Sequence, residues 1–190
     1  QGVPGFYATA AANLYVGYDG TAFVKPTASN EALASGQGFI WYLYDNDLDP
    51  DAGDPNNSES IALPMSISFE GSEPLAAVSV PTLHADGDGW NLLGNPFAAT
   101  LDVSNIATWD GSVTLASNVG QMWQCTPAAS PTVECIGSYV TTTTASNEVP
   151  VWQGVFYQAS GAGTLEVPLA ARGTSQSREA ASPLVAIRLD

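Results

Sequence analysis

The chain has 190 residues, 45% of them hydrophobic, which fits a globular domain with a buried core. Its charge is unusual, because 19 Asp and Glu face only 4 Lys and Arg and the formal net charge is −15. A surface this negative repels nucleic acid and anionic membranes, so nucleic acid is not expected as a partner. No apolar run approaches the about 20 residues that span a bilayer, so no transmembrane segment is expected.

The acidity also bears on habitat. Lys25 is the only lysine, and an acidic chain poor in lysine is typical of salt-adapted (halophilic) proteins, because dissolved salt screens the self-repulsion. An acidic secreted protein from an ordinary habitat is the alternative. The chain begins at Gln1 rather than at an initiator Met, so we expect a processed product or a fragment.

The two cysteines point to the compartment. Cys125 and Cys135 bracket a loop that contains Pro127 and Pro131, between two strand-like segments. This placement predicts a disulfide across a hairpin, which contributes ~2–3 kcal/mol for a loop this short. A structural disulfide implies an oxidising compartment, and we therefore expect an extracellular or cell-surface location. One histidine and no CxxC spacing leave little support for a zinc site.

In chain order, the pattern predicts strands almost throughout. Asp19-Gly20 is a strong hairpin signal between residues 13–18 and 21–24, and Phe39–Tyr44 is an apolar run expected of a central strand covered on both faces. Further strands are expected at 61–69, 76–81, 90–94, 113–116, 121–125, 135–142, 151–159, 164–168 and 184–189. The only helix expected is a turn or two at 103–108, with Asp102 or Ser104 as its cap.

This series predicts an all-β fold, a β-sandwich of about a dozen short and mostly antiparallel strands. We expect the module over residues 1–172, followed by a linker and a terminal strand over 173–190. Residues 34–42 echo residues 149–157, since each places Gln and Gly just before an aromatic strand. Two diverged β-units that share a core, with residues 90–96 between them, would explain the echo. Chance reuse of such strand starts is the alternative.

The most distinctive phrase lies in the middle of the chain. It runs Gly89-Trp90-Asn91-Leu92-Leu93-Gly94-Asn95-Pro96-Phe97, and a second phrase, Gln153-Gly154-Val155-Phe156, opens a later strand. Together they resemble the β-rich module, with the phrase Gly-Trp-Asn-Leu-Ile-Gly-Asn-Pro-Tyr, of secreted and surface proteins of Bacteroidetes and Rhodothermus-like bacteria. Leu93 and Phe97 are mild departures from that phrase. The resemblance spans roughly residues 13–172.

The resemblance implies a location and an architecture, because these proteins commonly travel by type IX secretion and the module has no established activity. In relatives a sorting domain often follows. Here the last residues, 187–190, look like the first strand of such a unit, which leaves the anchoring mechanism open.

The residue types of the central phrase all suit a folding role. Trp90 can supply a large buried area, and Gly94 suits a close backbone approach or a bulge. Asn95-Pro96 starts a turn, because Asn bonds local backbone and Pro fixes its own φ. We therefore predict that Gly89, Trp90, Asn91, Gly94, Asn95 and Pro96 form a structural motif, with direct ligand binding as the alternative.

An acidic loop is the candidate metal site. Asp45, Asp47, Asp49, Asp51 and Asp54 place carboxylates at nearly alternating positions, and calcium takes such hard oxygen ligands from a single loop. The EF-hand pattern fails, because Pro50 stands where that loop needs Gly and Asn56 where it needs Glu. A solvated acidic loop is the alternative, and no other cofactor is expected. The second acidic turn, Asp86-Gly87-Asp88-Gly89, is predicted first as a tight turn.

Catalysis is not expected. His84 is the single imidazole, predicted in an exposed loop, and the Gly-x-Ser-x-Gly nucleophile elbow is absent from the sequence. Aromatic residues could instead stack on sugars, for which Trp41, Tyr44 and Trp109 are the candidates, although large aromatics in β-domains are more often core residues.

The sequence therefore predicts a non-catalytic extracellular structural, adhesion or assembly module, whose partners are other surface or matrix components or copies of itself. A carbohydrate-binding module for polysaccharide is one alternative. A filament subunit that assembles by strand addition, with residues 184–189 as a candidate donor, is another.

Overall fold

A computed structural model describes residues 14–27, 32–41, 44–45, 60–61, 72–126, 136–142 and 147–176. Over these residues the chain is all-β, in short strands joined by turns. The strands are β1 (Leu14–Val16), β2 (Phe39–Trp41), β3 (Tyr44–Asp45), β4 (Ser60–Ile61), β5 (Val78–Ser79), β6 (Trp90–Gly94), β7 (Ala99–Asp102), β8 (Thr114–Leu115), β9 (Gln121–Thr126), β10 (Ile136–Thr141), β11 (Glu148–Val149), β12 (Gly154–Gly161), β13 (Glu166–Val167) and β14 (Arg172–Gln176). Two 3₁₀ turns, η1 (Ile106–Thr108) and η2 (Leu169–Ala171), complete the set.

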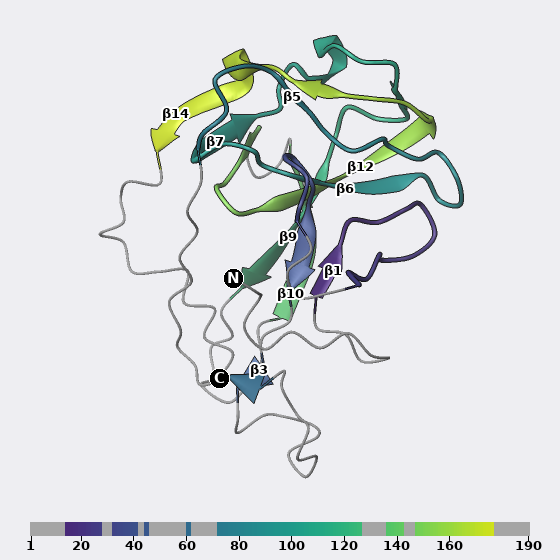
Figure 1. Ribbon diagram of the computed structural model, residues 1–190, viewed down its shortest axis with the longest axis vertical. Helices are drawn as coiled ribbons and strands as arrows, with labels where there is room; N and C mark the ends of the chain where they lie inside the picture. Colours follow the sequence, from purple (N-terminus) through teal and green to yellow (C-terminus); the bar gives the residue numbers. More distant parts are fainter. Residues whose placement is uncertain are drawn as a thin grey trace.

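The largest sheet has five strands in the order β10-β9-β12-β6, with β8 also pairing β12. All of its pairings are antiparallel, and the long strand β12 connects the two sides. In Figure 1, β6 and β12 cross the middle of the molecule and β9 and β10 run downward from them, while β5, β7 and β14 lie at the upper end. The smaller sheets are β11-β7-β14, β13-β5 and β1-β2, all antiparallel, and β3 pairs β4 in parallel.

The core lies on one face of the large sheet. Side chains alternate between faces along a strand, so Met122 of β9, Val155 and Tyr157 of β12 and Leu93 of β6 all point to that face, and all four are buried. The opposing side is built by residues such as Val78, Leu101, Val149 and Leu165 of the smaller sheets and their connections. This layered packing is consistent with the β-sandwich that the sequence predicts.

The segment that leads into β2 lies along one edge of β6, where Gln37 pairs with Leu93. Gly38 packs so closely on Leu92 of β6 that a Cβ there would lie 2.5 Å from the Leu92 Cγ. The backbone on either side joins β6, because the Gly38 amide donates to the Leu92 carbonyl and the Gly94 amide to the Gly36 carbonyl. On its other edge β6 pairs β12. Strand β6 thus lies between the two Gln-Gly segments of the predicted echo.

Several local predictions were wrong in informative ways. Asp19-Gly20 does turn the chain, but Tyr18 pairs with Phe23 and the loop between them has four residues, because the Asp19 carboxylate accepts hydrogen bonds from Thr21 and Ala22. Strand β2 is not central: it pairs β1 in a two-stranded sheet, and its residues are half-buried.

The helical turn at 103–108 is present but its cap differs. Asn105 occupies the N-cap position of η1 and makes no side-chain cap bond. The Asp102 carboxylate instead accepts from the Ser104 amide, which forms a turn ahead of the helix. Strands β7, β11 and β14 were not predicted, and β11 and β14 each pair with β7.

Some predictions fall outside the described residues. These are the terminal strand at 184–189 and nearly all of the strand at 61–69, of which only the first residue lies in β4. Strand β14 continues the β7 sheet through Gln176, past the expected module end at 172. Within the described ranges, no helix has the length and apolar character needed to cross a bilayer.

Candidate functional site

The central phrase, Gly89–Phe97, is occupied by internal bonds. Asn91 is 2% exposed, and its amide nitrogen donates to the carbonyls of His84 and Gly89, both at 2.8 Å. Its Oδ1 accepts from the His84 amide at 2.8 Å. The Asn91 side chain thus bonds both the N–H and the C=O of His84, as a neighbouring strand would. These bonds attach the segment before β6 to the sheet.

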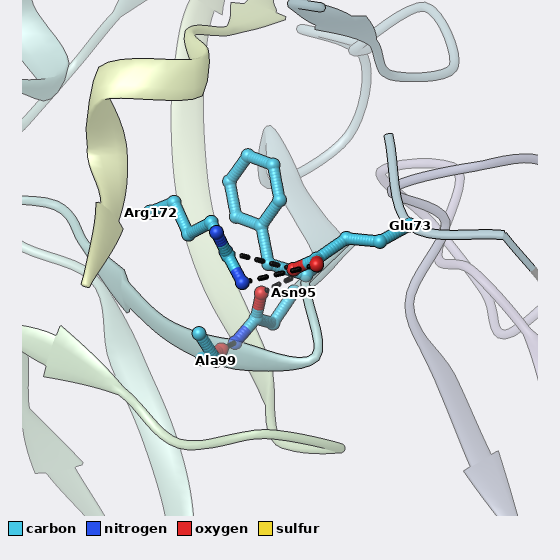
Figure 2. Close-up of polar contacts among 5 residues, drawn as sticks. Glu73, Asn95, Ala99 and Arg172 are labelled. Carbon is cyan, nitrogen blue, oxygen red and sulfur yellow. Dashed lines mark hydrogen bonds and ion pairs between the residues drawn. The ribbon is translucent and has the colours of Figure 1, made fainter. Parts of the chain in front are cut away.

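Asn95 plays the same part at the other end of the phrase. Its Oδ1 accepts from the Phe97 amide at 2.9 Å, and its amide nitrogen donates to the Ala99 carbonyl at 2.8 Å. The same nitrogen reaches the carbonyls of Val149 and Pro150, both at 3.2 Å. Figure 2 shows Asn95 bonded to Ala99 beside the ion pair of Arg172 and Glu73, whose Nε–Oε1 distance is 2.8 Å.

The turn that Asn95 holds carries the one non-glycine residue with positive φ in the described part of the chain. Trp152 has φ 66° and is 65% exposed, and the Gln153 amide donates to the Pro150 carbonyl to close the turn. The left-handed region is costly for a residue with a Cβ, by roughly 1–2 kcal/mol. An indole is therefore displayed at a position where glycine would be relaxed.

Two turns interlock at the start of the phrase. Gly20 and Gly87, with φ of 89° and 61°, lie back to back: a Cβ on Gly20 would meet the Asp86 carbonyl oxygen, and one on Gly87 would meet the Gly20 carbonyl oxygen. The Asp88 amide donates to that same Gly20 carbonyl. Asp86–Gly89 is thus the tight turn that the sequence predicts, closed by a bond from the Gly89 amide to the Asp86 carbonyl.

The acidic groups at these turns are used locally. Hydrogen bonds from the Ala22 backbone and from Thr21 lower the pKa of the Asp19 carboxyl. The Tyr18 hydroxyl donates to Asp88 Oδ2 at 3.1 Å, and desolvation followed by this bond to a carboxylate raises the pKa of the Tyr18 hydroxyl. Trp90 is half-buried and lies outside the core cluster, so it contributes less buried area than the sequence predicts.

A chain of aromatic contacts runs over the outer face of the large sheet. We call Tyr18, Phe23, Phe156, Tyr139 and Trp123 the aromatic row. Successive ring centroids lie 5.0, 6.3, 5.9 and 4.9 Å apart, with interplanar angles between 67° and 77°. Such edge-to-face contacts are the preferred geometry of aromatic pairs.

The row is buried at its middle ring, Phe156, and most exposed at the end formed by Tyr139 and Trp123. Phe156 of β12 is buried beneath Phe23 and Tyr139, whereas Trp123 of β9 and Tyr139 of β10 are 48% and 53% exposed. Trp123 and Tyr139 are direct cross-strand partners. The exposed end of the row thus consists of two large rings on neighbouring strands of one hairpin.

The two strands that carry these rings have no charged residue. Between Asp110 and Glu148 the sequence has a single charged residue, Glu134, although the whole chain carries 19 Asp and Glu and 4 Lys and Arg. Strands β9 and β10 themselves contain none. Aromatic enrichment with depletion of charge is the composition of the buried centre of protein interfaces.

The residues predicted for sugar stacking are placed elsewhere. Trp109 is half-buried and packs against the core cluster, and Trp41 is half-buried with its indole nitrogen enclosed. The side chain of Tyr44 lies outside the described set. Trp123 and Tyr139 were not among the candidates, although their alternation with the buried Met122 and the core-packed Val140 across the predicted hairpin could have identified them.

The predicted calcium ligands Asp47, Asp49, Asp51 and Asp54 lie outside the described residues, and of Asp45 only the backbone is described, in β3. Elsewhere in the described ranges, no cluster of three or more His, Cys, Asp or Glu could hold a metal ion. The predicted disulfide also rests on undescribed atoms, since Cys135 is outside the set. The hairpin it was to bridge is present, because β9 and β10 pair over their whole length.

Two titratable groups, His84 and Tyr157, lie in or beside the core. His84 is half-buried rather than exposed, because both of its backbone groups are bonded to Asn91. Tyr157 is fully buried, and burial raises the pKa of its hydroxyl to about 12 although Thr142 lies beside it. A buried phenol with so high a pKa remains protonated at neutral pH and serves packing.

Comparison with known proteins places no relative beside this chain: no family model, no curated protein and no solved structure matches it.

Proposed function

We propose that this chain is a non-catalytic module of a secreted or surface-attached bacterial protein, and that it acts by contact. The observation that carries the proposal is the exposed end of the aromatic row, Trp123 and Tyr139, on two uncharged strands of a very acidic chain. Trp and Tyr are the residues that most often dominate binding energy at interfaces. The resemblance of the central phrase to modules of type IX secretion substrates supports the extracellular setting.

The difference between the bonded polar side chains of the central phrase and the exposed rings of the hairpin also supports a contact role. The side-chain amides of Asn91 and Asn95 in the central phrase are hydrogen-bonded to the backbone, so they are not available to a ligand. The exposed rings of Trp123 and Tyr139, in contrast, make edge-to-face contacts with each other, and Tyr139 makes one with Phe156. Adhesion or assembly through this face is therefore our preferred function.

A carbohydrate-binding module remains the alternative. A flat sugar platform needs coplanar exposed rings, whereas Trp123 and Tyr139 lie at 75° to each other. The rings are thus better suited to filling a complementary pocket on a partner than to lying under a planar chain of sugars.

A retention assay tests the proposal. The purified chain is incubated with immobilised mucin and collagen and with insoluble cellulose and chitin, and the bound fraction is measured. We expect retention on mucin or collagen, reduced at least tenfold in the double variant Trp123→Ser/Tyr139→Ser. The matched control is Leu75→Ser, which removes a large apolar side chain that is 91% exposed and outside the aromatic row.

The outcomes separate the candidates. Retention on cellulose or chitin alone, lost in the double variant, would favour the carbohydrate-binding alternative. Retention that the double variant leaves intact, or no retention on any surface, would contradict a contact role for the aromatic row. Circular dichroism of each variant establishes that the fold is retained.

A further inference from the structure

We infer that the exposed end of the aromatic row is a cation site, at which the rings of Trp123 and Tyr139 receive an arginine side chain of a basic partner protein. This rests on the proposed contact function and names the chemistry of the partner. The juxtaposition that carries it is a corner of two exposed rings in a strongly acidic chain.

The two rings have the geometry that a cation needs. Their centroids lie 4.9 Å apart and their planes meet at 75°, and Trp123 and Tyr139 are 48% and 53% exposed. The face of an aromatic ring carries the negative part of its quadrupole and attracts a cation within about 6 Å of the ring centroid. Two nearly perpendicular faces therefore form part of an aromatic cage, in which one cation contacts both rings.

The hairpin brings no cation of its own to this corner. Residues 111–147 contain no Lys and no Arg, and the whole chain has only four such residues. Arg172, the single arginine within the described ranges, is bonded to Glu73 at 2.8 Å. We therefore assign the cation to a partner.

The charge of the chain favours a basic occupant. Its formal net charge of −15 attracts cationic partners and repels anionic ones. At the Tyr18 end of the row the interlocked turns expose Asp19, Asp86 and Asp88, and the Tyr18 hydroxyl donates to Asp88. A basic segment that lies along the row thus meets carboxylates at one end and the ring corner at the other.

Arginine suits the corner better than lysine. Its guanidinium is planar and weakly hydrated and stacks on aromatic faces, whereas the lysine ammonium is compact and strongly hydrated. Strands β9 and β10 carry no carboxylate that could replace the water lost from an ammonium. The corner is therefore expected to bind an arginine peptide more tightly than a lysine peptide of the same length.

An NMR titration of the full chain with a peptide of alternating Arg and Gly tests the inference. The indole N–H signal that Trp123→Phe removes belongs to Trp123, and of the five Trp signals it should shift the most. Trp123→Ser and Trp123→Leu should weaken binding by about fivefold, whereas Trp123→Phe keeps an aromatic face and should stay within about twofold. All three variants leave the net charge unchanged. The matched control, Leu75→Ser, should leave the affinity unaltered.

Three results overturn the inference. Affinity that Trp123→Ser leaves unchanged would show that net charge alone attracts the peptide. Affinity that Trp123→Leu retains would show an apolar contact rather than a cation site. Equal binding of the matched lysine peptide, or of a peptide with neutral citrulline in place of arginine, would refute the assignment of arginine.

The two proposals fail separately. Retention on mucin or collagen that is lost in Trp123→Ser/Tyr139→Ser, without any binding of the arginine peptide, would refute this inference and leave the proposed function standing. Circular dichroism of each variant establishes that the fold is retained.

Discussion

The central phrase on β6 and the hairpin of β9 and β10 belong to the same sheet and use their side chains in opposite ways. In the phrase, the side-chain amides of Asn91 and Asn95 form hydrogen bonds with backbone groups. Strand β6 is bonded to β12 on one edge and to the backbone of Gly36 and Gly38 on the other. In the hairpin, Trp123 and Tyr139 are exposed on strands that contain no charged residue. The most recognisable stretch of the sequence thus builds the fold, and a less distinctive stretch presents the surface.

The largest expected effect on the free energy of unfolding comes from removing the Asn91 side-chain bonds of the central phrase. Asn91→Leu keeps the side-chain size but removes the partners of the His84 amide and the His84 carbonyl, whereas the Gly89 carbonyl keeps its bond from the Ala159 amide. Since each buried unsatisfied group costs about 1–3 kcal/mol, we expect the free energy of unfolding to fall by about 3 kcal/mol or more. Urea denaturation measures it.

Two controls sharpen that comparison. Asn118→Leu makes the same substitution at an exposed site and should change the free energy of unfolding by about 0.5 kcal/mol or less. Trp123→Ser in the hairpin should cost about 1 kcal/mol, the scale of one edge-to-face pair. If Trp123→Ser proved as costly as Asn91→Leu, the division between a folding region and a presenting region would be refuted.

The strained turn beside the phrase gives the next effect, of opposite sign. Trp152→Gly should raise the free energy of unfolding by about 1 kcal/mol, because φ 66° is costly for a residue with a Cβ and not for Gly. Val151→Gly, at the neighbouring position without positive φ, should lower it. Thermal unfolding of both variants provides the measurement, and a destabilised Trp152→Gly would show that indole contacts outweigh the backbone strain.

The smallest effect concerns pH. Hydrogen bonds to the Asp19 carboxylate lower its pKa below the usual 3.8, so the folded state favours the charged form. The stability that this contributes is complete above about pH 3.8 and disappears as the pH falls through the lower folded pKa. The melting-temperature difference between wild type and Asp19→Asn should therefore shrink below that pH. A difference that stays constant down to pH 2 would contradict the assignment.

The fold class was predictable because it depends on alternation and turn residues. Strand β6 matched its predicted bounds, and β9 and β10 matched to within a residue, since Met122 and Val140 alternate with outward side chains. Strand β14, Arg172–Gln176, has no apolar alternation, and pairing with β7 determines its conformation. The presenting surface was missed for a related reason: whether Trp109 or Trp123 faces solvent depends on which layer covers each strand.

The back-to-back contact of Gly20 and Gly87 has a consequence for how such a chain can change over generations. Neither position tolerates a Cβ, so at these two glycines the first hairpin and the turn before β6 meet through main chain, beside the hydrogen bond from Tyr18 to Asp88. Substitution at the two glycines themselves offers no graded way to tighten or loosen the contact. Divergence at this joint must proceed by exchanging a whole turn, while the neutral hairpin can drift one residue at a time toward new partners.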